Sequence, residues 1–287
     1  MRRKGTRRKG IRRRGTRRGG VAVLAAVIAV ACSPQPEAAQ EQSAAATTTT
    51  TTAVTTTTPP TALPGPGGTT IPVFRQPYAY GTPQQHVPPI VDGMVPVVRR
   101  IETDRPYVFI TVDDGAVRHP AAIELMRKSG VEPTLFLNSK HVDGHADYFK
   151  GFDGVATVHA HTATHPDLSG TSYDFQRREI CGNADLLRAQ LGARPTLFRP
   201  PFGNFDHTTR RAAADCGFTA LVMWTAAVND GVVQFQAGGR LNAGDIVLMH
   251  FRHTFVEDFL AFLERCKLDG LTPVVLEDFL ADPKATV

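Results

Sequence analysis

Residues 107–115 have the sequence YVFITVDDG, in which an apolar run ends in two adjacent carboxylates. The run consists mainly of β-branched and aromatic side chains, which is typical of a strand buried on both faces of a parallel sheet. Two like charges at a strand end are costly unless a cation or a proton offsets them. Asp113 and Asp114 therefore either cap a chain reversal in which Gly115 takes a positive φ, or belong to a functional site.

The same alternation of strand and helix continues along the chain. Strands are predicted at residues 134–138, 155–158, 196–199, 219–224, 246–250 and 273–276, and helices at residues 119–129, 173–191, 207–216 and 255–266. Residues 95–102 alternate weakly and predict a hairpin or an edge strand. With about seven strands and mostly helical crossovers, the fold class is α/β, a distorted (β/α) barrel with parallel strands.

Polar side chains stand at the ends of four of these strands. They are Asp113, Asp114, His161, His165, Arg199 and His250. Because the carboxyl ends of parallel barrel strands share one face, and catalytic residues collect on that face, we expect these side chains to form one site.

The segment 161–165, HTATH, provides two imidazoles four residues apart. His161 and His165 with one carboxylate, Asp114, make a three-ligand set that leaves positions open, as in catalytic zinc sites. A metal in such a set makes a bound water acidic near neutral pH. Asp113 is then free to accept a proton, and His250 is suited to protonate a leaving amine.

Four segments together resemble a known family. They are TVDDG at 111–115, HTATH at 161–165, RPPFG at 199–203 and LMH at 248–250. In order and spacing they are similar to the motifs of the polysaccharide deacetylases, the NodB-homology enzymes of carbohydrate esterase family 4. The resemblance covers residues 106–280 and implies a NodB-like barrel that removes acetyl groups from N-acetylated amino sugars.

The resemblance also implies a role for each matched residue. Asp113 is the general base, tuned by Arg199, and His250 is the catalytic acid. Asp114, His161 and His165 bind one divalent metal ion, with zinc first and cobalt or nickel as alternatives. The substrate and oxyanion positions are Phe202, through its backbone N–H, together with Pro201, Leu248, which lines the acetyl pocket, and Trp224.

One segment departs from the family pattern. After Trp224 the sequence is TAAVNDG, where the family has two acids and a tryptophan. Asp230 matches one acid and is expected to support the site by pairing with Arg199, whereas Ala227 and Gly231 replace the other acid and the aromatic. This departure favours a competing hypothesis, a non-catalytic glycan-binding protein of the same fold. A hydrolase of a small non-peptide amide also stays open, because the sequence does not show whether the site is a long groove or a closed pocket.

The first 31 residues have the features of an export signal. Residues 1–20 hold eleven of the 32 basic residues and no acid, and residues 21–31 form an apolar run too short to span a bilayer. Cys32 follows in a bacterial lipobox-like context, which predicts a lipid anchor on the outer face of the cell membrane; an ordinary cleaved signal is the alternative. The remaining chain has 21 basic against 27 acidic residues, so the net charge of +5 indicates no nucleic-acid partner.

The domain plan follows from composition. After the signal peptide (1–31), residues 32–70 are rich in Thr, Ala and Pro and predict a disordered stalk. Residues 71–105 form an irregular lead-in with an edge hairpin, and residues 106–287 the catalytic domain. An envelope location makes peptidoglycan the expected glycan, ahead of chitin-like or xylan chains. The sequence gives no indication of an oligomeric state.

Two further side-chain predictions concern the interior. Outside the membrane a disulfide is permitted, and Cys216 and Cys266, which both end helices, are the expected pair, with buried free thiols as the alternative. Cys181 is expected to start its helix and therefore to lie at the opposite end of the barrel. His159 is predicted to be a solvated or hydrogen-bonded strand residue rather than a metal ligand.

Overall fold

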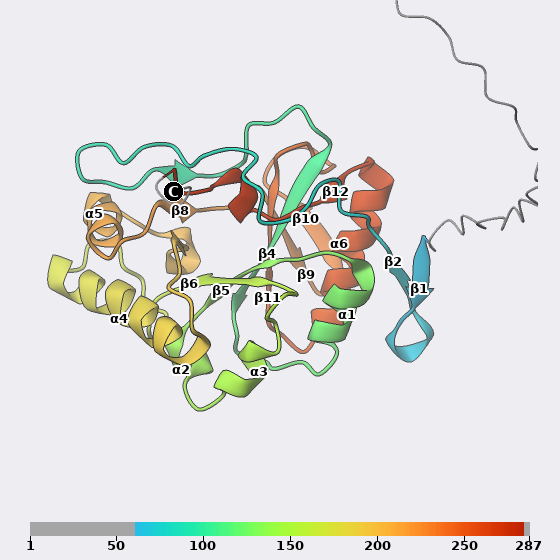
Figure 1. Cartoon of the computed structure of the whole chain (residues 1–287), viewed down its shortest axis with the longest axis horizontal. Helices are drawn as coiled ribbons and strands as arrows, with labels where there is room; N and C mark the ends of the chain where they lie inside the picture. Colours follow the sequence, from blue (N-terminus) through green and yellow to red (C-terminus); the bar gives the residue numbers. More distant parts are fainter. Residues whose placement is uncertain (1–60, 284–287) are drawn as a thin grey trace, which may run out of the picture. The chain divides into compact units, whose positions relative to one another are not determined.

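The computed structural model of the chain describes residues 61–283 (Figure 1). The predicted signal peptide, the lipidation site at Cys32 and most of the predicted stalk lie outside these residues. The end of the predicted stalk differs from expectation: β1 (Ala62–Pro64) and β2 (Thr70–Pro72) form an antiparallel pair. Ile71 of this pair is buried, because β2 contacts α1 (Ala122–Ser129) and α6 (Phe255–Asp269).

Strand β4 (Tyr107–Asp114) is central in a ten-stranded sheet, in agreement with its doubly buried sequence. The strand order is β10-β9-β11-β4-β5-β6-β7-β8-β3, with β12 paired to β4, and every pairing except β9 with β10 is parallel. The other strands are β3 (Val97–Val98), β5 (Thr134–Leu137), β6 (Thr157–Ala160), β7 (Leu197–Phe198), β8 (Ala220–Val222), β9 (Ala226–Asn229), β10 (Val232–Phe235), β11 (Ile246–His250) and β12 (Thr272–Pro273). The sheet is curled into a half-barrel, which confirms the predicted fold class.

The helices cover the outside of the sheet. Helix α4 (Tyr173–Leu191) and α5 (His207–Asp215) pack side by side on one flank, and α1 and α6 lie together on the other (Figure 1). Ser172 caps α4 by accepting a hydrogen bond from the Phe175 N–H, and Asp206 begins α5 with a capping box. Two short helices, α2 (Ser139–Val142) and α3 (Ala146–Lys150), were not predicted from the sequence.

The hairpin of β9 and β10 was also missed, although the sequence carried its signal. Asp230 and Gly231 form the two-residue turn with φ values of 51° and 72°, and Asp-Gly between β-forming segments is a strong hairpin indicator. Residues 95–102 contribute only the edge strand β3, which pairs in parallel with β8, so the edge-strand alternative is correct and the hairpin alternative is wrong.

The predicted Cys216–Cys266 disulfide is wrong. Cys181 and Cys216 are bonded, and Cys266 is a buried free thiol. Cys181 lies in the middle of α4 rather than at its start, and α4 packs against α5, whose C-cap is Cys216. Helices that follow neighbouring parallel strands lie side by side, and α4 and α5 follow the neighbouring strands β6 and β7. The order of the strands in the sheet therefore decided the disulfide, and the position of each cysteine at a helix end did not.

Within residues 61–283 no helix is long and apolar enough to cross a bilayer.

Candidate active site

A buried ion pair occupies the centre of the site. The Arg199 Nη1 donates hydrogen bonds to Asp113 Oδ1 at 2.8 Å and to Thr111 Oγ1 at 2.6 Å. The other guanidinium nitrogens donate to the carbonyls of Val222 and Met223, so β7, β8 and β4 are joined through one side chain. Arg199 is wholly buried, which requires such complete hydrogen bonding.

The environment of Asp113 favours a proton acceptor. Burial raises the pKa of Asp113 above its ordinary value, and this effect outweighs the opposing positive charges of Arg199 and His250. A carboxylate with a raised pKa binds a proton more readily than a solvated one, as a general base must. Since Oδ1 is engaged by Arg199, Oδ2 is the oxygen left to accept a proton; it lies 3.6 Å from His161 Nε2.

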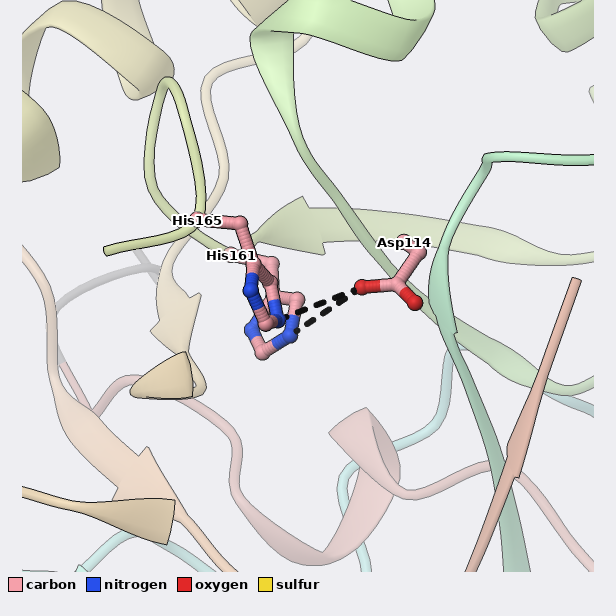
Figure 2. Close-up of side chains that lie close together, drawn as sticks. All are labelled: Asp114, His161 and His165. Atoms are coloured by element: carbon pink, nitrogen blue, oxygen red, sulfur yellow. Dashed lines mark ion pairs between the residues drawn. The ribbon is translucent and has the colours of Figure 1, made fainter. Parts of the chain in front are cut away.

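Asp114, His161 and His165 converge on one point, as the sequence predicted. The Nε2 atoms of His161 and His165 lie 3.6 Å and 3.4 Å from the same oxygen, Asp114 Oδ1 (Figure 2). The three ligand atoms lie within 4.8 Å of one another. His161 and His165 leave the end of β6 and Asp114 ends β4, so parallel strands separated only by β5 bring them together.

The chemistry of this set fits a divalent cation. Asp114 Oδ1 is buried and receives no hydrogen bond from any described residue. His161 Nδ1 lies 2.7 Å from the Arg199 carbonyl oxygen, which can only accept, so Nδ1 carries the proton and the Nε2 lone pair is left free. Burial lowers the pKa of His161 to about 3, so its imidazole is neutral, as a metal ligand must be.

The loop that carries His161 and His165, called here the ligand loop, is held by the amide side chains of Asn138 and Asn183. The sequence did not predict either contact. Asn183 Oδ1 accepts from the His161 N–H at 2.9 Å, and Asn183 Nδ2 donates to the Leu137 carbonyl at 3.1 Å. Asn138 Nδ2 donates to the carbonyl oxygens of His161 and Thr162. The sequence carried a signal for Asn183, because a polar residue stands there within the apolar stripe of the helix at residues 173–191. The structure buries it completely.

Strained backbone sets the direction of the ligands. Asp114, Thr162 and His165 all have positive φ, of 77°, 69° and 65°, which is uncommon for side chains with a Cβ. Gly115 has φ 83°, as the turn interpretation predicted, and a Cβ there would lie 2.9 Å from the Phe149 ring. The reversal after β4 is thus both a tight turn and part of the site.

His250 stands opposite Asp113 in the parallel register of β11 and β4. Burial lowers the pKa of His250, while the charges of Asp113 and Asp114 oppose that effect. Its Nδ1 is buried and has no hydrogen-bond partner among the described residues, which leaves the ring to be oriented by what binds in the site.

The predicted substrate residues surround this centre. Pro201 and Leu248 are buried, and the Trp224 ring lies 5.5 Å from the Arg199 guanidinium carbon. Phe202 has φ 60° and is 64% exposed, and its ring meets that of His165 edge-on at 4.6 Å. Phe202 therefore lies beside the ligand set, where an exposed aromatic can contact substrate.

Asp230 does not support the site in the way that was predicted. Within residues 61–283, Arg199 forms no hydrogen bond or ion pair with Asp230. Asp230 instead occupies the turn between β9 and β10, and Ala227 pairs in register with Leu248. The hairpin geometry directs the segment after Trp224 away from the role that the family pattern implied.

His159 is a hydrogen-bonded strand residue, in agreement with the expectation. Its Nδ1 accepts from the Leu197 N–H at 3.0 Å, and its Nε2 lies 2.6 Å from Glu277 Oε1. Both ring nitrogens are used, so neither is free for a metal.

Comparison with known proteins agrees with the fold and the site. The family model of polysaccharide deacetylase matches residues 100–221. An uncharacterised protein of Streptomyces coelicolor is 41% identical over 192 residues, which cover 64% of this chain and 77% of the relative. The chain belongs to the polysaccharide deacetylase family, a class of carbohydrate-acting hydrolases.

Solved structures share the fold at lower identity. A peptidoglycan N-acetylglucosamine deacetylase is 20% identical with a TM-score of 0.58, covering 66% of this chain and 95% of that one. A Bacillus anthracis protein described as a family 4 carbohydrate esterase pseudoenzyme is 22% identical with a TM-score of 0.56, covering 64% and 68%. Further curated relatives are named as xylan and chitin deacetylases, and the chain spans only 23 to 38% of their length.

Proposed function

We propose that this protein removes acetyl groups from the amino sugars of a polysaccharide by metal-dependent hydrolysis, with peptidoglycan as the substrate. The observation that carries the proposal is the position of Asp113, a buried carboxylate held by Arg199 beside the ligand set. Glycan binding alone requires neither a buried base nor an acid on the opposite strand. Amide hydrolysis requires both.

The residues divide the reaction between them. A divalent cation held by Asp114, His161 and His165 would act as a Lewis acid on the acetyl carbonyl and make a water molecule acidic near neutral pH. Asp113 accepts the proton of the attacking water. The Phe202 N–H donates to the oxygen that becomes negatively charged. His250 donates a proton to the departing amine nitrogen, and acetate is released.

The proposed location follows from the leader sequence. An export signal, a lipid at Cys32 and the Thr-rich stalk would hold the catalytic domain at the outer face of a bacterial membrane. Peptidoglycan is the N-acetylated polymer within reach there. A Cys32→Ser variant should move from the membrane fraction to the soluble fraction; retention in the membrane would refute the anchor.

A non-catalytic glycan-binding protein is the second candidate. Two observations favour it: Ala227 and Gly231 replace an acid and an aromatic, and one similar structure is described as a pseudoenzyme. The complete set of base, acid and ligands favours catalysis instead.

Acetate release from peptidoglycan fragments, with and without a chelator, separates these candidates when metal content is measured on the same sample. Release that the chelator abolishes supports the deacetylase. Bound metal without release refutes it and favours the binder, and a protein that binds no divalent metal would overturn the ligand assignment.

A further inference from the structure

The loop between β4 and α1 lies beside the site and is held in place by hydrogen bonds on both sides. The Val117 N–H donates to the carbonyl of Phe251 at 3.2 Å, and Phe251 directly follows His250, the proposed acid. On the other side, the Tyr148 hydroxyl donates to the His119 carbonyl at 2.9 Å. Arg118 lies between these two anchors. Its backbone is therefore held between the C-terminal end of β11 and α3, four residues after the metal ligand of β4.

This loop borders a pocket of about 610 Å³ that no step of the proposed reaction uses. It is lined by Arg118, Gly144, His145, Asp147, Tyr148 and Gln190, and we call it the Arg118 pocket. The loop after β4 forms one side, and the α2–α3 segment with the end of α4 forms the other. The pocket is open to solvent, so a polymer could pass across it.

Helix α2 contacts the loop that carries His161 and His165, and the chain runs from this helix directly into the segment that lines the Arg118 pocket. The imidazole of His141 lies close enough to Asp114 and to Arg118 for both charges to act on its pKa, which burial lowers. Lys140 Nζ donates to the carbonyl of Thr164, the residue before His165, at 3.1 Å. Helix α2 thus has one basic side chain bonded to the ligand loop and a second that senses both Asp114 and Arg118.

The acidic residues near the pocket already have partners. Gln190 donates to Asp143 Oδ1 at 2.8 Å, and Lys150 lies 3.7 Å from Asp147. Arg118, in contrast, forms no hydrogen bond or ion pair with any other residue between 61 and 283. Its guanidinium is the charge of the pocket that is free to bind a ligand.

We propose that the Arg118 pocket is a subsite for a sugar unit that carries an oxyanion, a carboxylate or a phosphate, next to the acetylated sugar at the metal-binding set. This proposal rests on the proposed deacetylase function. A guanidinium binds either oxyanion through two parallel hydrogen bonds. The half-buried ring of Tyr148 offers the apolar surface against which a sugar can pack. The N-acetylmuramic acid units of peptidoglycan carry a free lactyl carboxylate wherever the stem peptide has been removed, whereas chitin carries none.

The test compares three glycans of equal length on the whole protein. They are a neutral N-acetylglucosamine oligomer, a peptidoglycan glycan oligomer without stem peptides, whose lactyl carboxylates are therefore free, and the neutral oligomer carrying a sugar phosphate. KM is measured for each with the parent protein, Arg118→Ala, Arg118→Lys and Arg118→Glu. The matched control is Arg211→Ala, an exposed arginine on the outer helix α5. Affinity is also measured by calorimetry on His161→Ala, so that binding is followed without turnover.

The parent should have a KM about tenfold lower for an anionic glycan than for the neutral one, as one charge-assisted contact predicts. Arg118→Ala should bring the ratio of the two KM values close to one, Arg118→Lys should restore part of it, and Arg118→Glu should reverse it. The anionic glycan with the lower KM shows whether the subsite prefers a carboxylate or a phosphate. A ratio near one in the parent, or a ratio that Arg118→Glu leaves unchanged, overturns the subsite.

The two proposals can fail separately. If the parent releases no acetate but His161→Ala binds the anionic glycan more tightly than the neutral one, and adding Arg118→Ala removes that difference, the deacetylase is wrong and the subsite stands. If acetate is released equally from all three glycans, the deacetylase stands and the subsite is wrong.

Discussion

Arg199 and Asp113 form an ion pair with an Nη1 to Oδ1 distance of 2.8 Å, and both side chains are at most 3% exposed. The pair does not make Asp113 a weak base, because burial raises the pKa of the carboxyl more than the guanidinium lowers it. Arg199 thus orients one oxygen while the other remains available. This arrangement separates the roles of two adjacent aspartates.

Asp113→Asn should retain bound metal and lose turnover by about 10²- to 10⁴-fold, the usual contribution of a general base. The amide has nearly the same shape but cannot accept the proton at the same position. His161→Ala is the comparison, and it should lose both metal and activity. Metal content and acetate release, measured on each variant, check the assignment. Loss of metal from Asp113→Asn would show that Asp113 is itself a ligand.

Asn183→Ala should weaken divalent metal binding about 10- to 100-fold, because it removes one of the two acceptors of the His161 N–H and a donor to the Leu137 carbonyl. Metal affinity measured by competition with a chelator is the readout. Arg188→Ala, on the exposed side of the same helix, is the control and should leave affinity unchanged. Equal affinities for the parent and Asn183→Ala would mean that the loop is positioned without this amide.

The disulfide between Cys181 and Cys216 should stabilise the folded domain by about 3–4 kcal/mol, given a sequence separation of 35 residues. Peptide mapping without reduction should find these two cysteines in one linked fragment, and Cys181→Ser should lower the midpoint of denaturant unfolding. Cys266→Ala is the control: it should leave the linked fragment intact. A linked fragment that contains Cys266 would contradict the pairing.

Glu277 should make stability depend on acid pH. Burial is the largest single effect on the Glu277 carboxyl and raises its pKa. The interactions with His159 and Thr157 together lower the pKa by more, so the net shift is downward. The ionised group therefore stabilises the fold above its unfolded pKa, and this contribution is lost as pH falls through the lower folded pKa. Glu277→Gln should cost about 1–3 kcal/mol at neutral pH and lose less stability on acidification.

Denaturant unfolding at neutral pH and at about pH 3 measures this difference. The exposed Glu264→Gln is the matched control and should behave like the parent at both values. If Glu277→Gln lost as much stability on acidification as the parent, the acid dependence would have to arise from other carboxyls.

The local sequence was sufficient to predict the barrel-like fold and the residues that converge on the candidate site. The apolar run before Asp113 predicted β4, and the apolar stripe with its following glycine predicted α4 with the bounds that the structure shows. Because parallel strands place their carboxyl ends on one face, the direction of the strands and the residue types at their ends predicted that Asp114, His161 and His165 would meet. These features depend on periodicity and direction, which a single segment of chain encodes.

Tertiary structure alone decided the features that depend on which segments become neighbours. Cys216 bonds to Cys181 because α5 packs on α4, and Asp230 turns a hairpin instead of meeting Arg199. Asn183 holds the ligand loop because one turn of a helix faces the end of a distant strand. A sequence specifies which residue types a segment contains, but hydrogen bonds and disulfides between segments require a distance that only the packed chain defines.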